Sequence, residues 1–310
     1  MSLASPPMSD RPRILVSMPV GTRMGGDDPR AQVELAKRVE GAGADGVVLA
    51  DHVLMGKHPE RYPWGTFPFP ADAPWLEPLT VLTAIAAVTE RITLTTGILI
   101  VPLRPAALLA KTAATLDVLS RGRLELGVGT GWQEEEFTAQ GLDPAQRGQL
   151  LTDYVAACRE LWRGGPASFA SESVEFEDVW SEPTPVRVGG PPILFSGTLT
   201  RRNLDRIVRL GDGWIPIMGE TADGISSGVA TLRDELGRAG RDPSSLIVRA
   251  PAPIQKGADD APSLGATLDG VDALAELGVT DVNLHIMAFV PTDDAVPAYF
   301  DELERRLASW

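Results

Sequence analysis

Two hydrophobic patterns alternate along the chain. Short apolar, β-branched runs predict buried strands, and stretches with apolar residues every three to four positions predict helices packed on them. The predicted strands span residues 13–17, 46–50, 92–101, 124–128, 192–195, 213–217, 247–255 and 281–287. The predicted helices span residues 29–42, 76–89, 105–120, 144–162, 200–210, 223–239, 263–277 and 297–307. Eight strand–helix units predict a (β/α)8 TIM barrel, with a doubly wound open sheet as the alternative.

Two long insertions interrupt this alternation. Residues 53–75, after the second strand, carry five prolines and several aromatic residues, and residues 164–191, after the fourth helix, read as a surface excursion. The first insertion follows the carboxyl end of a strand, where barrel enzymes place their active sites. We interpret it as the wall or lid of a substrate pocket that includes Trp64, Phe67 and Trp75. A satellite hydrophobic cluster would explain the same residues equally well.

Composition and charge restrict the partners. The 310 residues include 42 acids and 28 Lys or Arg, so the formal net charge is -14. This charge argues against nucleic acid and anionic membranes, and we expect a small-molecule substrate instead. Residues 1–12 read as a disordered lead-in, and residues 13–310 as one domain. No secretory signal and no membrane-length apolar run is visible, so we expect a cytoplasmic protein.

A single cysteine excludes an internal disulfide. Cys158 lies on an apolar helix stripe with Leu161 and Trp162, which predicts a core thiol rather than a nucleophile. No metal-ligand cluster, hydrolase elbow or nucleotide-binding lysine loop is visible, so we predict no metal site.

A glycine-rich turn follows the fourth predicted strand, with glycines at 127, 129 and 131. Such glycines let backbone N–H groups approach a ligand closely. The string alone would suit a dinucleotide turn or an S-adenosylmethionine methyltransferase. Both of those place it after the first strand of a domain, whereas here three strand–helix units precede it.

Histidine and acidic residues supply further candidates. Asp51 and His52 directly follow the second strand, so His52 is a candidate for proton transfer, with capping of the loop by a hydrogen bond as the alternative. His285 lies in the eighth strand and points either into the barrel or outward. Glu134 and Glu135 suit a helix N-terminus, and Glu136 suits a structural anchor.

Small residues and arginines follow the fifth strand. Ser196, Gly197 and Thr198 precede a helix that begins with arginines 201 and 202. This arrangement suits a phosphate, and ordinary capping of the helix by Thr198 or Thr200 is the alternative.

Taken together, these strings resemble the luciferase-like monooxygenase superfamily, and most closely its branch that uses the deazaflavin coenzyme F420. The resemblance rests on the order and spacing of the strings at 50–52, 96–98, 116–124, 127–132, 136–137, 141–142, 147 and 211–214.

The resemblance implies a flavin or deazaflavin ring at the carboxyl ends of the strands. It also implies a cis peptide between Gly97 and Ile98 behind the ring, and Asp51 and His52 at the polar edge of the ring. The implied cofactor-binding residues along the tail and phosphate are Gly129, Thr130, Gly131, Trp132, Ser196, Gly197 and Thr198.

The activity implied is hydride transfer between F420 and a small organic substrate, with proton transfer by His52. One alternative is a monooxygenase of the same superfamily that uses reduced FMN and takes it from a flavin reductase. A methyltransferase and a non-catalytic binding barrel are further alternatives. A homodimer is also implied by the resemblance.

Overall fold

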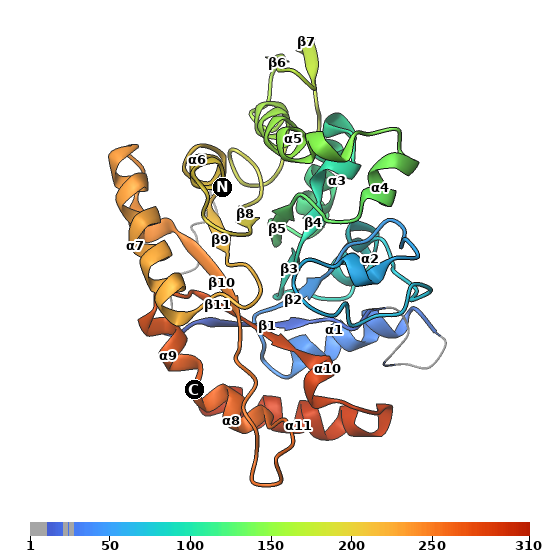
Figure 1. The fold of residues 1–310 in the computed structure, drawn as a ribbon, viewed down its shortest axis with the longest axis vertical. Helices are drawn as coiled ribbons and strands as arrows, with labels where there is room; N and C mark the ends of the chain where they lie inside the picture. The colour runs from blue at the N-terminus through green and yellow to red at the C-terminus, as the bar shows by residue number, and fades with distance from the viewer. Residues whose placement is uncertain (1–10, 21–23, 25–27) are drawn as a thin grey trace.

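The computed structural model describes residues 11–20, 24 and 28–310. Within this part of the chain, eight parallel strands close into a barrel surrounded by helices (Figure 1). The barrel closes where β3 pairs with β5, with Leu94 opposite Leu124. The predicted (β/α)8 barrel is therefore confirmed, and the open sheet is wrong. The barrel strands are β1 (Arg13–Ser17), β2 (Gly46–Leu49), β3 (Thr93–Thr96), β5 (Leu124–Gly129), β8 (Ile193–Ser196), β9 (Gly213–Ile215), β10 (Ile247–Pro251) and β11 (Asp281–His285).

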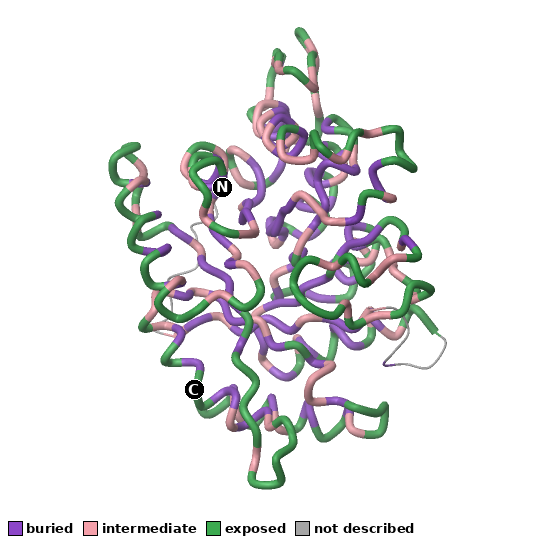
Figure 2. The backbone as a smooth tube through the Cα atoms, in the orientation of Figure 1, coloured by how far each residue is buried: buried purple, intermediate pink, exposed green. Residues whose placement is uncertain are grey.

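The outer layer consists of amphipathic helices whose apolar faces cover the strands, as the burial pattern in Figure 2 shows. They are α1 (Ala31–Gly41), α2 (Pro78–Ala86), α3 (Ala106–Leu119), α5 (Arg147–Leu161), α6 (Arg201–Leu210), α7 (Ala222–Arg238), α8 (Leu264–Asp269), α9 (Val271–Glu276) and α11 (Val296–Ala308). The short helices are α4 (Glu134–Ala139) and α10 (Ile286–Phe289). None of the helices in the described ranges is both long and apolar enough to cross a membrane.

Several predicted boundaries differ from the structure. The predicted strand 92–101 divides into β3 and the short β4 (Leu99–Ile100), with Gly97 and Ile98 between them, and Ile100 of β4 donates its N–H to Asp51 at 2.8 Å. The predicted strand 247–255 ends at Pro251, which has no N–H for a ladder. The predicted helix 263–277 divides at Gly270 into α8 and α9.

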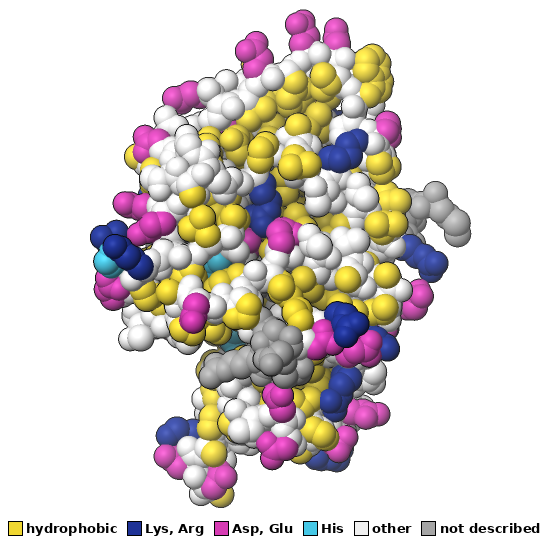
Figure 3. Space-filling model, turned by 90° about the vertical axis from the view of Figure 1, so that its right-hand side faces the viewer, with side chains coloured by type: hydrophobic (Ala, Val, Ile, Leu, Met, Phe, Trp, Pro, Cys, Tyr) yellow, Lys and Arg dark blue, Asp and Glu magenta, His cyan; other side chains and the backbone are white. Residues whose placement is uncertain are grey.

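The second insertion forms a hairpin that the sequence pattern did not reveal. Its antiparallel strands are β6 (Ala167–Ala170) and β7 (Glu175–Val179), and the rings of Phe169 and Phe176 lie 5.9 Å apart. The hairpin projects from the barrel at the top of Figure 1. At the same end of Figure 3, hydrophobic side chains gather below a rim of acidic ones.

Two of the sequence segments that carry the family resemblance, 116–124 and 211–214, have a structural role. Arg123 donates to the carbonyl oxygen of Ile92 at 2.9 Å. It also donates to the carbonyl oxygens of Ala86, the last residue of α2, and of Thr89, just beyond it. Asp212 accepts from the N–H of Ile193 at 2.9 Å and pairs with Arg159. Both therefore tie strands to the helices between them.

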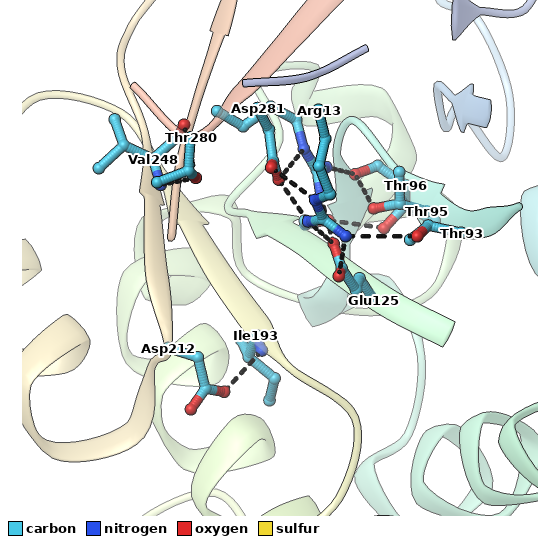
Figure 4. Close-up of polar contacts among 12 residues, drawn as sticks. Arg13, Thr93, Thr95, Thr96, Glu125, Ile193, Asp212, Val248, Thr280 and Asp281 are labelled. Carbon is cyan, nitrogen blue, oxygen red and sulfur yellow. Dashed lines mark hydrogen bonds and ion pairs between the residues drawn. The ribbon is translucent and has the colours of Figure 1, made fainter. Parts of the chain in front are cut away.

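Four charged side chains fill the barrel near the amino ends of the strands: Arg249, and the residues Arg13, Glu125 and Asp281 that Figure 4 labels. Arg13 donates to Asp281 at 2.7 and 2.8 Å and to Glu125 at 2.9 and 3.1 Å. Arg249 donates to Glu125 at 3.1 Å. Two cations therefore face two carboxylates, the condition under which charges are tolerated inside a protein. Burial opposes ionisation of Glu125, but Arg13 and Arg249 outweigh that effect and lower its pKa.

Cys158 lies in the core, 1% exposed, as predicted. Burial raises the pKa of its thiol to about 12. Most of the predicted lead-in lies outside the described residues, and the predicted division into a lead-in and one domain stays a prediction. Arg11, within the described part, lies over the Trp310 ring and pairs with Asp45 at 3.4 Å.

Candidate active site

The candidate site is built from loops at the carboxyl ends of the strands, and Asp51 is its first residue. Arg104 donates to the two carboxylate oxygens of Asp51 at 2.7 and 3.0 Å, and Ile100 donates its N–H at 2.8 Å. Burial raises the pKa of this carboxyl, and the Arg104 guanidinium opposes the rise. Asp51 thus holds the segment that follows β3, and its contact with a cofactor ring stays a prediction.

His52 is buried beside Asp51 and paired with an acid that lies 84 residues further along the chain. Its Nδ1 lies 3.2 Å from Oε2 of Glu136, a side chain with no exposed surface. The other oxygen of Glu136 accepts the N–H of Val53 at 2.7 Å. The sequence reading of Glu136 as an anchor is therefore confirmed, but its contact with His52 was missed, because the two residues belong to different strand–helix units.

Gln133 reinforces the same connection. Its Oε1 accepts the N–H of Gly56 at 2.8 Å, and its Nε2 lies 3.3 Å from Nδ1 of His52 and 3.4 Å from the carbonyl oxygen of Leu54. The turn after β5 and the loop after β2 are consequently joined by side chains from one short helix and its N-cap.

The aromatic residues of the first insertion gather around His52. The ring of Trp75 lies 4.7 Å from the His52 ring, and Phe67 and Trp132 lie 5.8 and 6.0 Å from it. Trp64 contacts the cluster through Tyr62 at 5.3 Å and remains largely exposed. The indole N–H of Trp75 is buried without a hydrogen-bond partner among the described residues. Whether the cluster contacts a substrate stays a prediction.

Glycines on neighbouring strands allow close packing behind the site. The Gly97–Ile98 peptide is cis, as the resemblance implied. A Cβ on Gly129 would lie 2.9 Å from the Ile98 side chain, and one on Gly131 would lie 2.7 Å from Ile100. Gly131 also has a φ of 71°, which disfavours any side chain. The Ile98 and Ile100 side chains therefore pack directly against the backbone of these two glycines.

The turns after β5 and β8 start side by side, because Val128 pairs with Phe195. Within the described residues, no partner bonds the Ser196 and Thr198 hydroxyls or the backbone N–H groups of Thr198 and Leu199. The N–H groups of residues 130–133 are likewise without partners there. Such free donors suit an anionic group. Thr200, rather than Thr198, caps α6.

Trp214 and Asn203 hold the turn after β8 in place. Trp214 donates from its indole N–H to the carbonyl oxygen of Gly197 at 2.8 Å, and Asn203 donates to that of Thr198 at 3.2 Å. A hollow of about 230 Å³ opens beside Thr198 between α6 and α7. Glu220 lines this hollow, and its negative charge would repel an anion. An anion therefore fits the turn after β8 better than it fits the hollow.

His285 points into the barrel mouth. Asp281, four residues earlier on β11, contacts Arg13 inside the barrel, and alternate strand residues share a face. His285 pairs in register with Ser17 of β1 and stays exposed, while desolvation by the surrounding protein lowers its pKa. The two orientations left open by the sequence are thereby resolved.

The comparisons with known proteins agree with this architecture. The sequence profile of luciferase-like monooxygenases matches residues 13–270. An uncharacterised protein of Mycobacterium tuberculosis is 36% identical over 233 residues, covering 75% of this chain and 77% of that protein.

Two solved structures share the fold. Monooxygenase RslO1 of Streptomyces bottropensis has a TM-score of 0.74 at 18% identity and covers 96% of each chain. An F420-dependent secondary alcohol dehydrogenase has a TM-score of 0.72 at 17% identity, covering 89% of this chain and 93% of the other. By its profile match and its M. tuberculosis relative, the chain belongs to the luciferase-like monooxygenase family.

Proposed function

We propose that this protein is an oxidoreductase in which F420 exchanges a hydride with a small organic substrate at the carboxyl ends of the barrel strands. The observation that carries the proposal is the set of unpartnered donors on the adjacent turns after β5 and β8. These donors fit a cofactor with a phosphate-bearing tail. When bound, the deazaflavin supplies the hydride chemistry, and the protein supplies binding and orientation.

The turn after β8 would bind the phosphate. The hydroxyls of Ser196 and Thr198 and the N–H of Leu199 can donate to its oxygens without breaking a protein hydrogen bond. The N–H groups of 130–132 would line the rest of the tail. Trp214 holds the carbonyl of Gly197, so the donors are ordered before the ligand arrives.

His52 would move the proton that accompanies hydride transfer. Its Nδ1 faces Glu136, and no described residue bonds its Nε2, which is therefore the nitrogen available to a substrate. The aromatic side chains of Phe67, Trp75 and Trp132 would exclude water from that proton and present an apolar wall to the substrate.

A monooxygenase that uses reduced FMN, supplied by a flavin reductase, is the second candidate. The likeness to RslO1 favours it, as the likeness to the F420-dependent alcohol dehydrogenase favours F420. FMN also carries a phosphate, so the same donors would serve it. Oxygen consumption during turnover separates the two. No feature of the site favours a methyltransferase.

Equilibrium binding tests the proposal directly. Fluorescence quenching would compare oxidised and reduced F420 with oxidised and reduced FMN on the purified protein. We expect tighter binding of F420, and a loss of roughly tenfold or more in the Ser196→Ala/Thr198→Ala variant, because bonds to a charged group are removed. Ser226→Ala, an exposed serine on α7, is the control and should bind as the wild type does. Tighter FMN binding would transfer the assignment to the monooxygenase, and binding of neither would reject the cofactor site.

We also propose a homodimer that buries α2 and α3. Residues 78–89 contain no charged residue, and the exposed face of α3 carries one charge, Lys111, beside Leu108, Val118 and Leu119. The exposed faces of α1, α6, α7 and α11 all carry several charges. Copies with a net charge of -14 repel one another, so a nearly uncharged face is where they can meet.

A further inference from the structure

We propose that Glu136 is a positioning residue that holds His52 in the tautomer protonated at Nδ1, leaving Nε2 free to accept a proton. The inference extends the role that the proposed function gives His52. Its central claim, the tautomer of a buried imidazole, concerns the protein alone and can be tested without cofactor or substrate.

The Glu136 carboxylate is fixed before it meets the imidazole. One oxygen accepts the N–H of Val53 at 2.7 Å, and the other lies 3.2 Å from Nδ1 of His52. Because Val53 directly follows His52, a single carboxylate holds both the ring and the backbone that carries it. The Glu136 side chain has no exposed surface, so water does not compete for its oxygens.

Nδ1 has two neighbours that require opposite protonation states. Glu136 offers an acceptor, and the Gln133 amide nitrogen, 3.3 Å away, offers a donor. The orientation of the Gln133 amide is set, because its oxygen accepts the N–H of Gly56 at 2.8 Å. The amide nitrogen has a second acceptor in the carbonyl of Leu54, at 3.4 Å.

The carboxylate decides between the two states. An unprotonated Nδ1 would place two acceptors face to face inside the protein, whereas a protonated Nδ1 makes a charge-assisted hydrogen bond with Glu136. Gln133 then keeps its bond to the loop carbonyl. An acid that orients a histidine in this way also stabilises the imidazolium once Nε2 has taken a proton.

The rest of the pocket leaves Nε2 as the functional atom. Trp75 meets the imidazole edge-on at 4.7 Å and an interplanar angle of 74°, and Phe67 and Trp132 lie near it. These rings restrict rotation of the imidazole. No described residue bonds Nε2.

Nitrogen-15 NMR measures the tautomer directly. The chain contains three histidines, so long-range ¹H–¹⁵N spectra of untagged protein at alkaline pH give three ring patterns, which His58→Gln and His285→Gln assign by elimination. We expect the Nδ1–H form for His52 in the wild type. An Nε2–H pattern would overturn the proposal, and this measurement requires no change at Glu136.

Substitution of Glu136 gives a second test. Glu136→Gln presents a second amide to Nδ1 and is expected to switch His52 to the Nε2–H form. Glu136→Asp keeps the charge and should restore the Nδ1–H form. Glu135→Gln removes the neighbouring acid, which pairs with Arg61 at 3.6 Å, and should leave the tautomer unchanged. A tautomer that is the same in Glu136→Gln as in the wild type would contradict the proposal.

Turnover links the tautomer to the proposed function. Glu136→Gln should lower kcat roughly 10²- to 10⁴-fold, the usual range for acid–base catalysis, with little change in cofactor affinity. Glu136→Asp should recover part of the loss. A failure of cofactor binding in the wild type would reject the proposed function and leave the tautomer result standing. A switched tautomer with undiminished kcat would show that Glu136 positions a ring that catalysis does not use.

Discussion

Asp51 and Arg104 form a bidentate ion pair, with donor–acceptor distances of 2.7 and 3.0 Å, that connects the end of β2 to the segment after β4. The Asp51 side chain is fully buried, and that of Arg104 is 13% exposed. Together with the N–H of Ile100, Arg104 supplies the partners of this carboxylate. Asp51 therefore holds the backbone at Ile100 and the side chain of Arg104 against the end of β2.

Replacing Arg104 with leucine should destabilise the fold. The change leaves Asp51 buried with one backbone donor, and removing one member of a buried ion pair costs about 3–5 kcal/mol. Urea denaturation at neutral pH would measure the free energy of unfolding. Arg61→Leu removes an exposed arginine and should cost less than about 1 kcal/mol. Equal losses in the two variants would show that the pair has no special role.

The barrel-centre cluster should make stability depend on acid pH. The pKa of Glu125 is lowered, so its ionised form stabilises the fold above the unfolded value of about 4.3, and this contribution is lost as the pH falls through the lower folded value. Unfolding curves measured from pH 7 to pH 3 should show that the free energy of unfolding falls less for Glu125→Gln than for the wild type. At pH 7 the variant should be the less stable of the two. Parallel curves would contradict the assignment.

His285 should titrate below the ordinary histidine range. Desolvation at the barrel mouth lowers its pKa, so between the folded value and about 6.5 the unfolded chain binds the proton more readily. Lowering the pH through that range therefore favours unfolding. An NMR titration of the imidazole C–H signals would compare folded protein with urea-unfolded protein. His285→Asn should remove this part of the pH dependence, and a folded pKa at or above the unfolded one would be inconsistent with it.

The proposed dimer should dissociate when charge is placed on α2 and α3. Leu108→Glu/Leu119→Glu adds two acids to the nearly uncharged face, where burial of unpaired charges is unfavourable. Light scattering coupled to gel filtration should show a dimer for the wild type and a monomer for the variant. Met218→Glu, at an exposed apolar residue after β9, should remain dimeric. A wild-type monomer, or a variant that stays dimeric, would reject this face.

The elements that the sequence predicts well are those with a strong local pattern. The runs at 13–17, 46–50 and 124–128 are continuously apolar or nearly so, and each became a barrel strand. The hairpin β6–β7 was missed because its strands have weak apolar alternation and pack mainly on each other. The break between β3 and β4 was also missed, because the largely apolar run 92–101 continues through Gly97 and Ile98, which belong to neither strand.

In the candidate site, too, residues with a local sequence signal were predicted and their distant partners were not. Asp51, His52 and the glycine turn were found because they directly follow strands, and the carboxyl ends of parallel strands meet at one end of a barrel. The partners of these residues were not found. Arg104, and Glu136 as a partner of His52, come from other strand–helix units, and no local spacing relates them.

The sequence by itself determined the barrel class, because continuous apolar runs and apolar residues every three to four positions are local properties of the chain. It also identified the loops after the second, fourth and fifth predicted strands as candidates for the functional site. The tertiary structure alone decided which side chains pair: Glu136 with His52, Arg104 with Asp51, and Arg13 with Glu125 and Asp281. These pairings arise when strands separated by tens to hundreds of residues become neighbours and exclude the water that would otherwise satisfy each charge.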